Sequence, residues 1–222
     1  MVFEAIKKDP KGFLDTVNEA VSKAKEQAYA EQEKKMAAQM EEEFKNPKKP
    51  KIDEGRVFWG TKDAPVTIVE YSDFLCPYCA RAHVTLTQLL EKYKGKIRIF
   101  YKHYPNHRYS MESAQYFEAV ALQDHEKARK FHDYLYEHQR ELYNEGIPFL
   151  DKAVKKVGAN LKKVKKDIEK ESIKKRIRED KEEAIKFGFN GTPGFLINGV
   201  SVNGALPIDH FSKIIDRHLK GK

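Results

Sequence analysis

The pattern of apolar and polar residues predicts a βαβ unit in the middle of the chain. Residues 56–60 and the β-branched run 66–71 predict two strands, and residues 97–101 alternate between apolar and polar positions as a third. Between the second and third strands, residues 77–93 place their apolar side chains on one side of a helix, which ends before Gly95. A strand, a helix and a strand in this order predict a parallel pair joined by a right-handed crossover.

A long helical block follows this unit. The helical pattern extends from about residue 111 to residue 187, and breaks at residues 123–124, 146–148 and 158–160 divide it into roughly four helices. A block of this size is large enough to form an inserted subdomain.

The end of the chain returns to strands. Two short apolar runs, residues 195–197 and 200–202, flank Asn198-Gly199. Asn-Gly between apolar runs is the strongest short indication of a hairpin with a type I′ turn. A last helix is expected over residues 208–219. The complete order of elements predicts an α/β, thioredoxin-like fold with an inserted helical subdomain.

The beginning of the chain has a different pattern and predicts an N-terminal helical extension. Residues 11–44 predict one long helix that would bury too little apolar surface to be stable alone. It packs either on a second copy of the chain or on its own globular domain. Near-heptad spacing favours the second copy, at Leu14, Val17, Val21, Ala24 and Ala28. We therefore expect an oligomerisation segment over residues 1–47, a Pro- and Lys-rich linker over 48–55, and a thioredoxin-like domain over 56–222.

Charge and hydropathy exclude some classes of function. The formal net charge is +8, but the basic residues between positions 152 and 178 are interleaved with acids at helical spacing. This is typical of a solvated helix face, and no nucleic-acid partner is expected. No run of about 18 apolar residues predicts a membrane span. No signal peptide is recognisable, so the chain is either cytosolic or a mature form whose leader has been removed.

Cys76 and Cys79 are the only cysteines in the sequence, and they flank Pro77-Tyr78 at the start of a predicted helix. Unpaired N–H groups and the helix dipole favour a thiolate at the first cysteine, and the second, one turn later, can close a disulfide with it. Pro77 suits the first helical turn because no N–H is needed there. Zinc normally needs four ligands, and a structural bridge over so short a loop would stabilise little. The motif therefore favours redox chemistry.

Two further features point to the same chemistry. Glu70 lies on an otherwise apolar strand six residues before Cys76, so we expect a buried carboxylate with a raised pKa that accepts the proton of Cys79. A solvated strand carboxylate is the alternative. Downstream, the Thr192-Pro193 bond lies between two glycines, before a strand. A cis bond there would expose the backbone of Thr192 to a substrate segment, whereas a plain turn is the alternative.

Two side chains near the cysteines carry weaker expectations. Tyr78 is uncharged and cannot stabilise a thiolate as a histidine in its place would. We therefore expect the Cys76 thiolate to be only moderately favoured and the protein to be a mild oxidant. His83, one turn past Cys79, is expected on the helix surface, and electrostatic support of the thiolate is the alternative.

The sequence resembles the DsbA family of bacterial disulfide-exchange proteins over about residues 53–219. The resemblance rests on residues 69–79, VEYSDFLCPYC in one-letter code, and on residues 191–195, GTPGF. It implies that Cys76 is the nucleophile, Cys79 the resolving thiol and Glu70 the buried acid. Substrate-facing positions would be Thr192, Pro193, Pro77 and Tyr78. No metal is expected, and no cofactor besides the redox-active Cys76–Cys79 disulfide.

The N-terminal helix and linker further resemble the suppressor-of-copper-sensitivity C branch, whose members carry an N-terminal oligomerisation segment. This resemblance implies a homo-oligomer, a dimer or trimer, that exchanges, isomerises or introduces disulfides in unfolded or misoxidised proteins, with isomerisation favoured by the N-terminal segment. The family implies a periplasmic location after signal cleavage and a membrane redox partner of DsbB or DsbD type. Tyr78 departs from the histidine common in DsbA oxidases. A dithiol reductase and a copper(I)-binding protein of the same fold remain alternatives.

Overall fold

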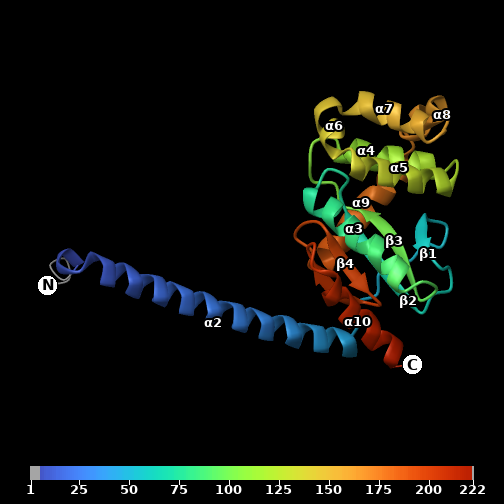
Figure 1. Ribbon diagram of the computed structural model, residues 1–222. Helices are drawn as coiled ribbons and strands as arrows, with labels where there is room; N and C mark the ends of the chain where they lie inside the picture. The colour runs from blue at the N-terminus through green and yellow to red at the C-terminus, as the bar shows by residue number, and fades with distance from the viewer. Residues whose placement is uncertain (1–5, 222) are drawn as a thin grey trace. The chain divides into compact units, whose positions relative to one another are not determined.

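The computed structural model describes residues 6–221 and divides into two units, residues 1–46 and 47–222 (Figure 1). The first five residues of the expected N-terminal segment and the last residue of the expected thioredoxin-like domain lie outside the described residues. Among the described helices, none is both long and apolar enough to cross a membrane.

The smaller unit consists mainly of α2 (Pro10–Lys45). This helix begins where the side chain of Asp9 accepts a hydrogen bond of 2.9 Å from the N–H of Gly12, and Pro10 occupies the first turn. Leu14, Val17 and Val21 are all exposed along it. The apolar seam that the heptad spacing predicts is therefore not covered by other described residues of the same unit.

A mixed sheet in the order β1-β3-β2-β4-β5 forms the centre of the larger unit. Strands β2 and β3 are parallel, as the predicted crossover requires, and the β4–β5 pair is the hairpin predicted at Asn198-Gly199. Both turn residues have positive φ, 46° and 91°, as a type I′ turn needs. The strands are β1 (Phe58–Gly60), β2 (Val66–Ser72), β3 (Ile97–His103), β4 (Gly194–Ile197) and β5 (Val200–Asn203).

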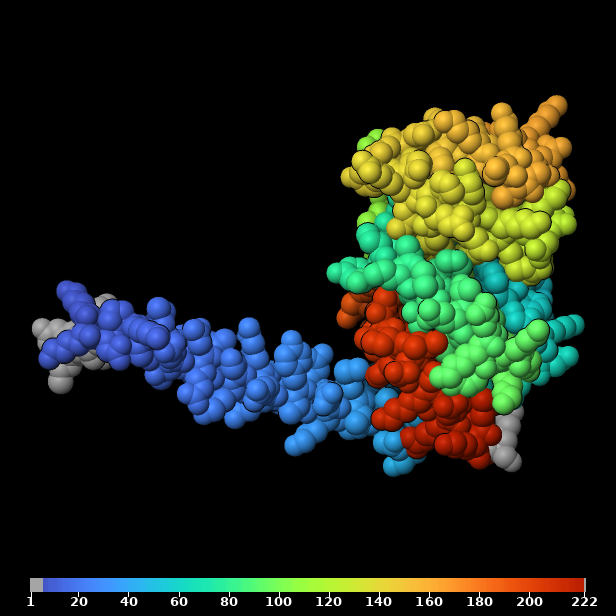
Figure 2. All heavy atoms as spheres, viewed as in Figure 1, coloured from blue at the N-terminus to red at the C-terminus, as the bar shows by residue number. Residues whose placement is uncertain are grey.

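Helices cover both faces of this sheet. On one face lie α3 (Pro77–Lys92) and α10 (Ile208–Lys220), and on the other lies α9 (Glu171–Lys186). Side chains of β2 alternate between the two: Tyr71 packs with Phe189 on the α9 side, whereas Glu70 faces α3. Figure 2 shows α3, in green, between α10, in red, and the helical block, in yellow.

The helical block over residues 110–186 contains six helices, not the roughly four that the sequence predicts. The additional breaks fall at His138 and at residues 168–170, where neither Gly nor Pro marks them. Side chains stabilise these breaks: Nδ1 of His138 bonds the carbonyl of Tyr134 at 3.0 Å, and Nζ of Lys170 pairs with Asp167 at 2.7 Å. Besides α9, the helices are α4 (Ser110–Ala121), α5 (His125–Glu137), α6 (Gln139–Glu145), α7 (Ile147–Lys156) and α8 (Leu161–Asp167).

A buried ion cluster connects the block to the sheet. Arg56, just before β1, donates two hydrogen bonds of 2.7 Å to Asp180 of α9 and one of 3.1 Å to Glu118 of α4. His103, at the end of β3, contacts the same Glu118 oxygen at 2.9 Å. Burial opposes ionisation of Glu118, but the charges of Arg56 and His103 lower its pKa to about 2.

Replacing Arg56 by Met should destabilise the fold by about 3–5 kcal/mol, because two carboxylates would remain buried without their shared cation. Urea denaturation measures this difference in the free energy of unfolding. Arg140→Met, at an exposed position of α6, is the matched control and should change stability little. Equal stabilities of the two variants would contradict a structural role for the cluster.

Candidate active site

Cys76 and Cys79 lie where β2 leads into α3. Cys76 is the N-cap residue of α3, with φ −81° and ψ 120°, and Pro77 is the first residue of the helix. The carbonyl of Cys76 accepts hydrogen bonds from the N–H groups of Cys79 at 3.0 Å and Ala80 at 3.2 Å. Both thiols are free, and Cys79 is fully buried one turn into the helix.

The environment of Cys76 favours its thiolate. A hydrogen bond from the Cys79 thiol is the largest influence, and the Thr192 side chain and the N–H groups of Cys79 and Tyr78 add to it. Burial opposes these effects, and the result is a pKa of about 5. This stabilisation is stronger than the moderate one expected from the uncharged side chain of Tyr78. Hydrogen bonds to the sulfur account for it.

Cys79 has the opposite tendency. Its burial raises the pKa of its thiol well above the usual range, and the neighbouring Cys76 raises it further. At neutral pH the pair therefore consists of a thiolate at Cys76 and a thiol at Cys79. Only Cys76 is ready to attack, and Cys79 must lose a proton before it can.

Glu70 lies beneath this pair, as the sequence predicts. It sits on the central strand β2, opposite Tyr101 of β3 and Phe195 of β4, and is only 2% exposed. Burial raises the pKa of this carboxyl to about 7, although Ser72 lowers it and the charge of Cys76 raises it further. Its Oε1 has no hydrogen-bond partner among the described residues. A carboxyl with this pKa can both accept and donate a proton near neutral pH.

A hydroxyl network that the sequence does not reveal lies beside Glu70. The Ser72 hydroxyl is 2.9 Å from that of Tyr136 in α5, which is 3.3 Å from the hydroxyl of Tyr101. Burial raises the pKa of Tyr101 and of Tyr136 well above 10, so both remain neutral. Tyr136 is 60 residues from Cys76 in sequence, and no local pattern identifies it.

The helical block also holds the loop that carries Cys76. The side-chain amide of Gln139 in α6 donates hydrogen bonds of 2.7 Å to the carbonyl of Phe74 and 3.0 Å to that of Cys76. Both donors of one amide group are thus used on the same loop. Sequence reasoning missed Gln139 because nothing near it in the chain suggests a role.

Asp73 anchors the same loop from the sheet side. Its carboxylate accepts hydrogen bonds from the backbone N–H of Leu75 at 2.9 Å and of Asn106 at 2.8 Å. It also contacts Nδ1 of His107 at 2.8 Å and the hydroxyl of Ser110 at 2.5 Å. Asp73 falls within the run that resembles the DsbA family, but its position there did not predict these contacts.

The structure brings Thr192 beside the cysteines. The Thr192-Pro193 bond is cis, as expected, and Sγ of Cys76 lies 3.4 Å from the carbonyl oxygen of Thr192. Pro193 is buried, and its carbonyl accepts a hydrogen bond of 2.8 Å from the N–H of Gly204. An open hollow of about 480 Å³ is lined by Gly188, Asn190, Gly191, Thr192, Pro193, Asn203 and Gly204.

Tyr78 is the exposed member of the motif. Its side chain is 57% exposed, and the guanidinium of Arg81 lies 4.4 Å from the centre of its ring. This places an apolar, hydrogen-bonding ring on the surface beside the reactive sulfur.

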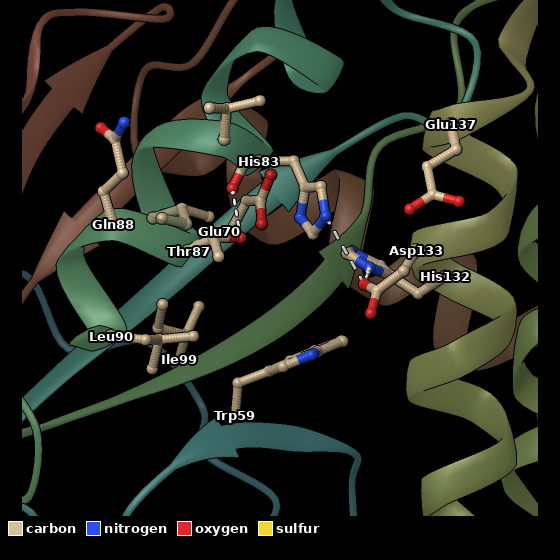
Figure 3. A pocket seen from close by; sticks show the side chains of 12 residues that line it. Trp59, Glu70, His83, Thr87, Gln88, Leu90, Ile99, His132, Asp133 and Glu137 are labelled. Atoms are coloured by element: carbon tan, nitrogen blue, oxygen red, sulfur yellow. Dashed lines mark hydrogen bonds and ion pairs between the residues drawn. The ribbon is translucent and has the colours of Figure 1, made fainter.

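The expectation that His83 lies on the helix surface is wrong. Helix α5 packs against α3 there, so the His83 ring stacks on Tyr136 at 5.3 Å and meets the His132 ring edge-on at 5.1 Å. Both histidines line a pocket of about 510 Å³ that reaches Glu70 (Figure 3). The sequence does not predict this pocket because α3 and α5, which form two of its walls, are far apart in the chain.

A stabilised thiolate at a helix N-terminus, a buried second thiol and a buried acid define a thiol–disulfide oxidoreductase of thioredoxin-like fold. A family model described as thioredoxin matches residues 52–217, and the chain belongs to this thioredoxin family. The fold class and the enzyme class predicted from the sequence are thus confirmed.

Relatives and solved structures agree with this assignment. A "probable disulfide bond formation protein D" of Bacillus anthracis is 32% identical over 171 residues, which cover 72% of this chain and 77% of the relative. Oxidised BdbD from Bacillus subtilis has a TM-score of 0.70 at 23% identity, over 78% of this chain and 97% of that one. The catalytic domain of Proteus mirabilis ScsC has a TM-score of 0.64 at 23% identity, over 76% and 91%. The two structures share the fold.

The pKa of Glu70 has a consequence for stability. Because it is raised from 4.5 to about 7 in the folded state, the folded protein binds this proton more tightly than the unfolded chain. Protonated Glu70 therefore contributes its full stabilisation of the folded state below about pH 4.5. This contribution to the free energy of unfolding is lost as the pH rises through about 7. Glu70→Gln should therefore match the wild type near pH 4 and be more stable by up to about 3 kcal/mol above pH 7.

Urea denaturation of the oxidised protein between these pH values measures the difference without titration of the thiols. Glu91→Gln, at an exposed position of α3, is the control and should follow the wild type throughout. A Glu70→Gln curve parallel to that of the wild type would show that Glu70 is not a buried, protonated acid.

Proposed function

We propose that the protein exchanges disulfides in unfolded or misoxidised proteins outside the cytoplasm, with Cys76 as the nucleophile and Cys79 as the resolving thiol. The observation that carries the proposal is the placement of the pair: Cys76 is the N-cap of α3, its Sγ lies 3.4 Å from the Thr192 carbonyl, and Cys79 is fully buried one turn later. The relatives named for disulfide bond formation support it. Protein disulfides form and persist in oxidising compartments, which supports the location.

The exchange begins when the Cys76 thiolate attacks one sulfur of a substrate disulfide. A mixed disulfide forms, and the other substrate sulfur leaves as a thiolate. In isomerisation, a different substrate thiolate attacks the mixed disulfide, a new substrate disulfide forms, and Cys76 returns as a thiolate. No electrons are gained or lost overall, and no cofactor is needed.

Cys79 ends the reaction when no substrate thiolate does so. Its sulfur attacks Sγ of Cys76, the substrate leaves as a thiol, and the Cys76–Cys79 disulfide forms with two electrons passed to the substrate. Cys79 must first lose its proton, and Glu70, with a pKa of about 7, is the group we assign as its acceptor. In the oxidising direction the same carboxyl returns the proton to Cys79.

The substrate segment would lie along Thr192 and Pro193, with Pro77 and Tyr78 on the other side of the sulfur. The 3.4 Å distance from Sγ of Cys76 to the Thr192 carbonyl supports this placement. The hollow beside Thr192 and the exposed ring of Tyr78 offer backbone and apolar contacts without selecting for one sequence. Such contacts suit an enzyme whose substrates are many unfolded chains.

The apolar seam of α2 supports a homo-oligomer, a dimer or trimer, and with it isomerase activity. Leu14, Val17 and Val21 are exposed at heptad spacing on a 36-residue helix. When one catalytic domain of such an assembly forms a mixed disulfide with a substrate, the active site of a second catalytic domain lies near the same substrate. A membrane partner of DsbB or DsbD type would reset the redox state of the pair, and the low pKa of Cys76 favours its dithiol form.

Refolding of scrambled ribonuclease tests the activity. The wild type should accelerate recovery of ribonuclease activity, and Cys76→Ser should reduce the rate to that without enzyme. Cys79→Ser should instead accumulate mixed disulfides with the substrate, because the resolving thiol is missing. Equal activity of Cys76→Ser and the wild type would contradict the assigned nucleophile.

Light scattering tests the oligomer. The full chain should be a dimer or trimer, and removal of residues 1–47 should give a monomer that still reduces insulin but isomerises poorly. Within the full chain, Leu14→Asp with Val21→Asp should dissociate the assembly, because charges enter the seam. Thr16→Asp with Ser22→Asp adds the same charge beside the seam and should not. A monomeric wild type would contradict the proposed assembly.

A further inference from the structure

The pocket between α3 and α5 has a composition unusual for this chain. The protein has 42 Lys and Arg residues and a net charge of +8. Yet no Lys or Arg lines this pocket, whereas two histidines and three carboxylates do. The carboxylates are those of Glu70, Asp133 and Glu137, and the histidines are His83 and His132. A pocket with this lining attracts a cation.

Three of these side chains already converge on one point. Nε2 of His83 lies 3.5 Å from Oδ1 of Asp133, and Nδ1 of His132 lies 2.9 Å from the same oxygen. One ligand atom from each of the three lies within 4.8 Å of the others. With metal–ligand distances of about 2.0–2.1 Å, the ligand atoms of a tetrahedral zinc ion lie about 3.4 Å apart. Figure 3 shows both rings beside the Asp133 carboxylate.

His132 provides a second, independent observation. The residue is 3% exposed, and its Nε2 has no hydrogen-bond partner among the described residues. Its ring is nearly perpendicular to the rings of Tyr101, Tyr136 and Phe74, at centroid distances of 4.9, 4.9 and 5.7 Å. Among the described residues, the hydrogen-bond partner of this buried ring is Asp133, at Nδ1.

The two ring nitrogens approach the same carboxylate oxygen from two helices. Nδ1 of His132 lies 2.9 Å from Oδ1 of Asp133, and Nε2 of His83 lies 3.5 Å from it. A divalent ion at this point accepts a lone pair from each ring nitrogen and from the carboxylate.

We propose that His83, His132 and Asp133 bind a divalent transition-metal ion, with zinc as the best-matched ion. Imidazole nitrogens with one carboxylate are typical zinc ligands, whereas calcium and magnesium prefer oxygen ligands only. Both rings bind a metal ion in their neutral form. Glu137, one turn after Asp133, adds a negative charge, and the pocket leaves room for water as the fourth ligand.

The site would connect two parts of the fold. His83 belongs to α3, which carries the cysteines, whereas His132 and Asp133 belong to α5 of the helical block. A bound ion would therefore join the catalytic helix to the block by coordinate bonds and stabilise the folded state as any specific ligand does. It would do so without using Cys76 or Cys79.

Zinc titration of the oxidised full-length protein tests the site, because the Cys76–Cys79 disulfide removes both thiolates as competing ligands. Trp59 is the only tryptophan, and its ring lies 4.6 Å from that of His132. Its fluorescence should therefore change saturably with zinc. Cobalt in place of zinc should give the visible absorption of a tetrahedral site.

His83→Ala and Asp133→Asn should each weaken binding by about 100-fold, since even supporting groups cost about 10–100-fold. Asp133 is 43% exposed, so its variant should fold normally. His125→Ala, at an exposed position of α5, is the control and should bind as the wild type does. Absence of saturable binding by the oxidised wild type, or unchanged binding by both ligand variants, would overturn the proposal. Neither outcome depends on disulfide-exchange activity.

Discussion

The active site depends on one constraint: water is excluded from the face of the central strand β2 that carries Glu70. Glu70 and Cys79 are both buried there, and burial raises the pKa of each. Negative charge is therefore excluded from the interior and remains at Cys76, where the helix N-terminus and hydrogen bonds stabilise it. The division of roles between two chemically identical thiols follows from hydrogen bonds at Cys76 and from burial at Cys79.

Much of the fold follows from local patterns in the sequence. The β-branched run of β2, the Asn198-Gly199 turn and the Cys-Pro-Tyr-Cys motif each predict their own structure, because neighbouring residues determine it. Two breaks in the helical block escaped prediction, since side-chain contacts at His138 and Lys170 stabilise them in place of Gly or Pro. Glu70 was predictable because a lone acid in an apolar strand is conspicuous.

The rest of the site depends on contacts between distant segments. Tyr136, Gln139 and His132 come from the helical block and reach the cysteines or Glu70 only because α5 and α6 pack over α3. No spacing in the sequence connects them to Cys76. Tyr78 was a poor guide to the thiolate for a different reason: the hydrogen bonds that lower the pKa of Cys76 come mainly from Cys79 and Thr192. Residue type at one position does not replace knowledge of the surroundings.

Gln139 couples the helical block to the reactive sulfur in a thermodynamic sense. Its amide bonds the carbonyls of Phe74 and Cys76, so the loop has its lowest free energy only when α6 is in place. A molecule that binds Cys76 preferentially in this loop conformation also stabilises the bonded arrangement of α6, and a ligand that prefers that arrangement of the block raises affinity at Cys76 by the same free energy. Reciprocity of this kind links the insertion to the catalytic loop.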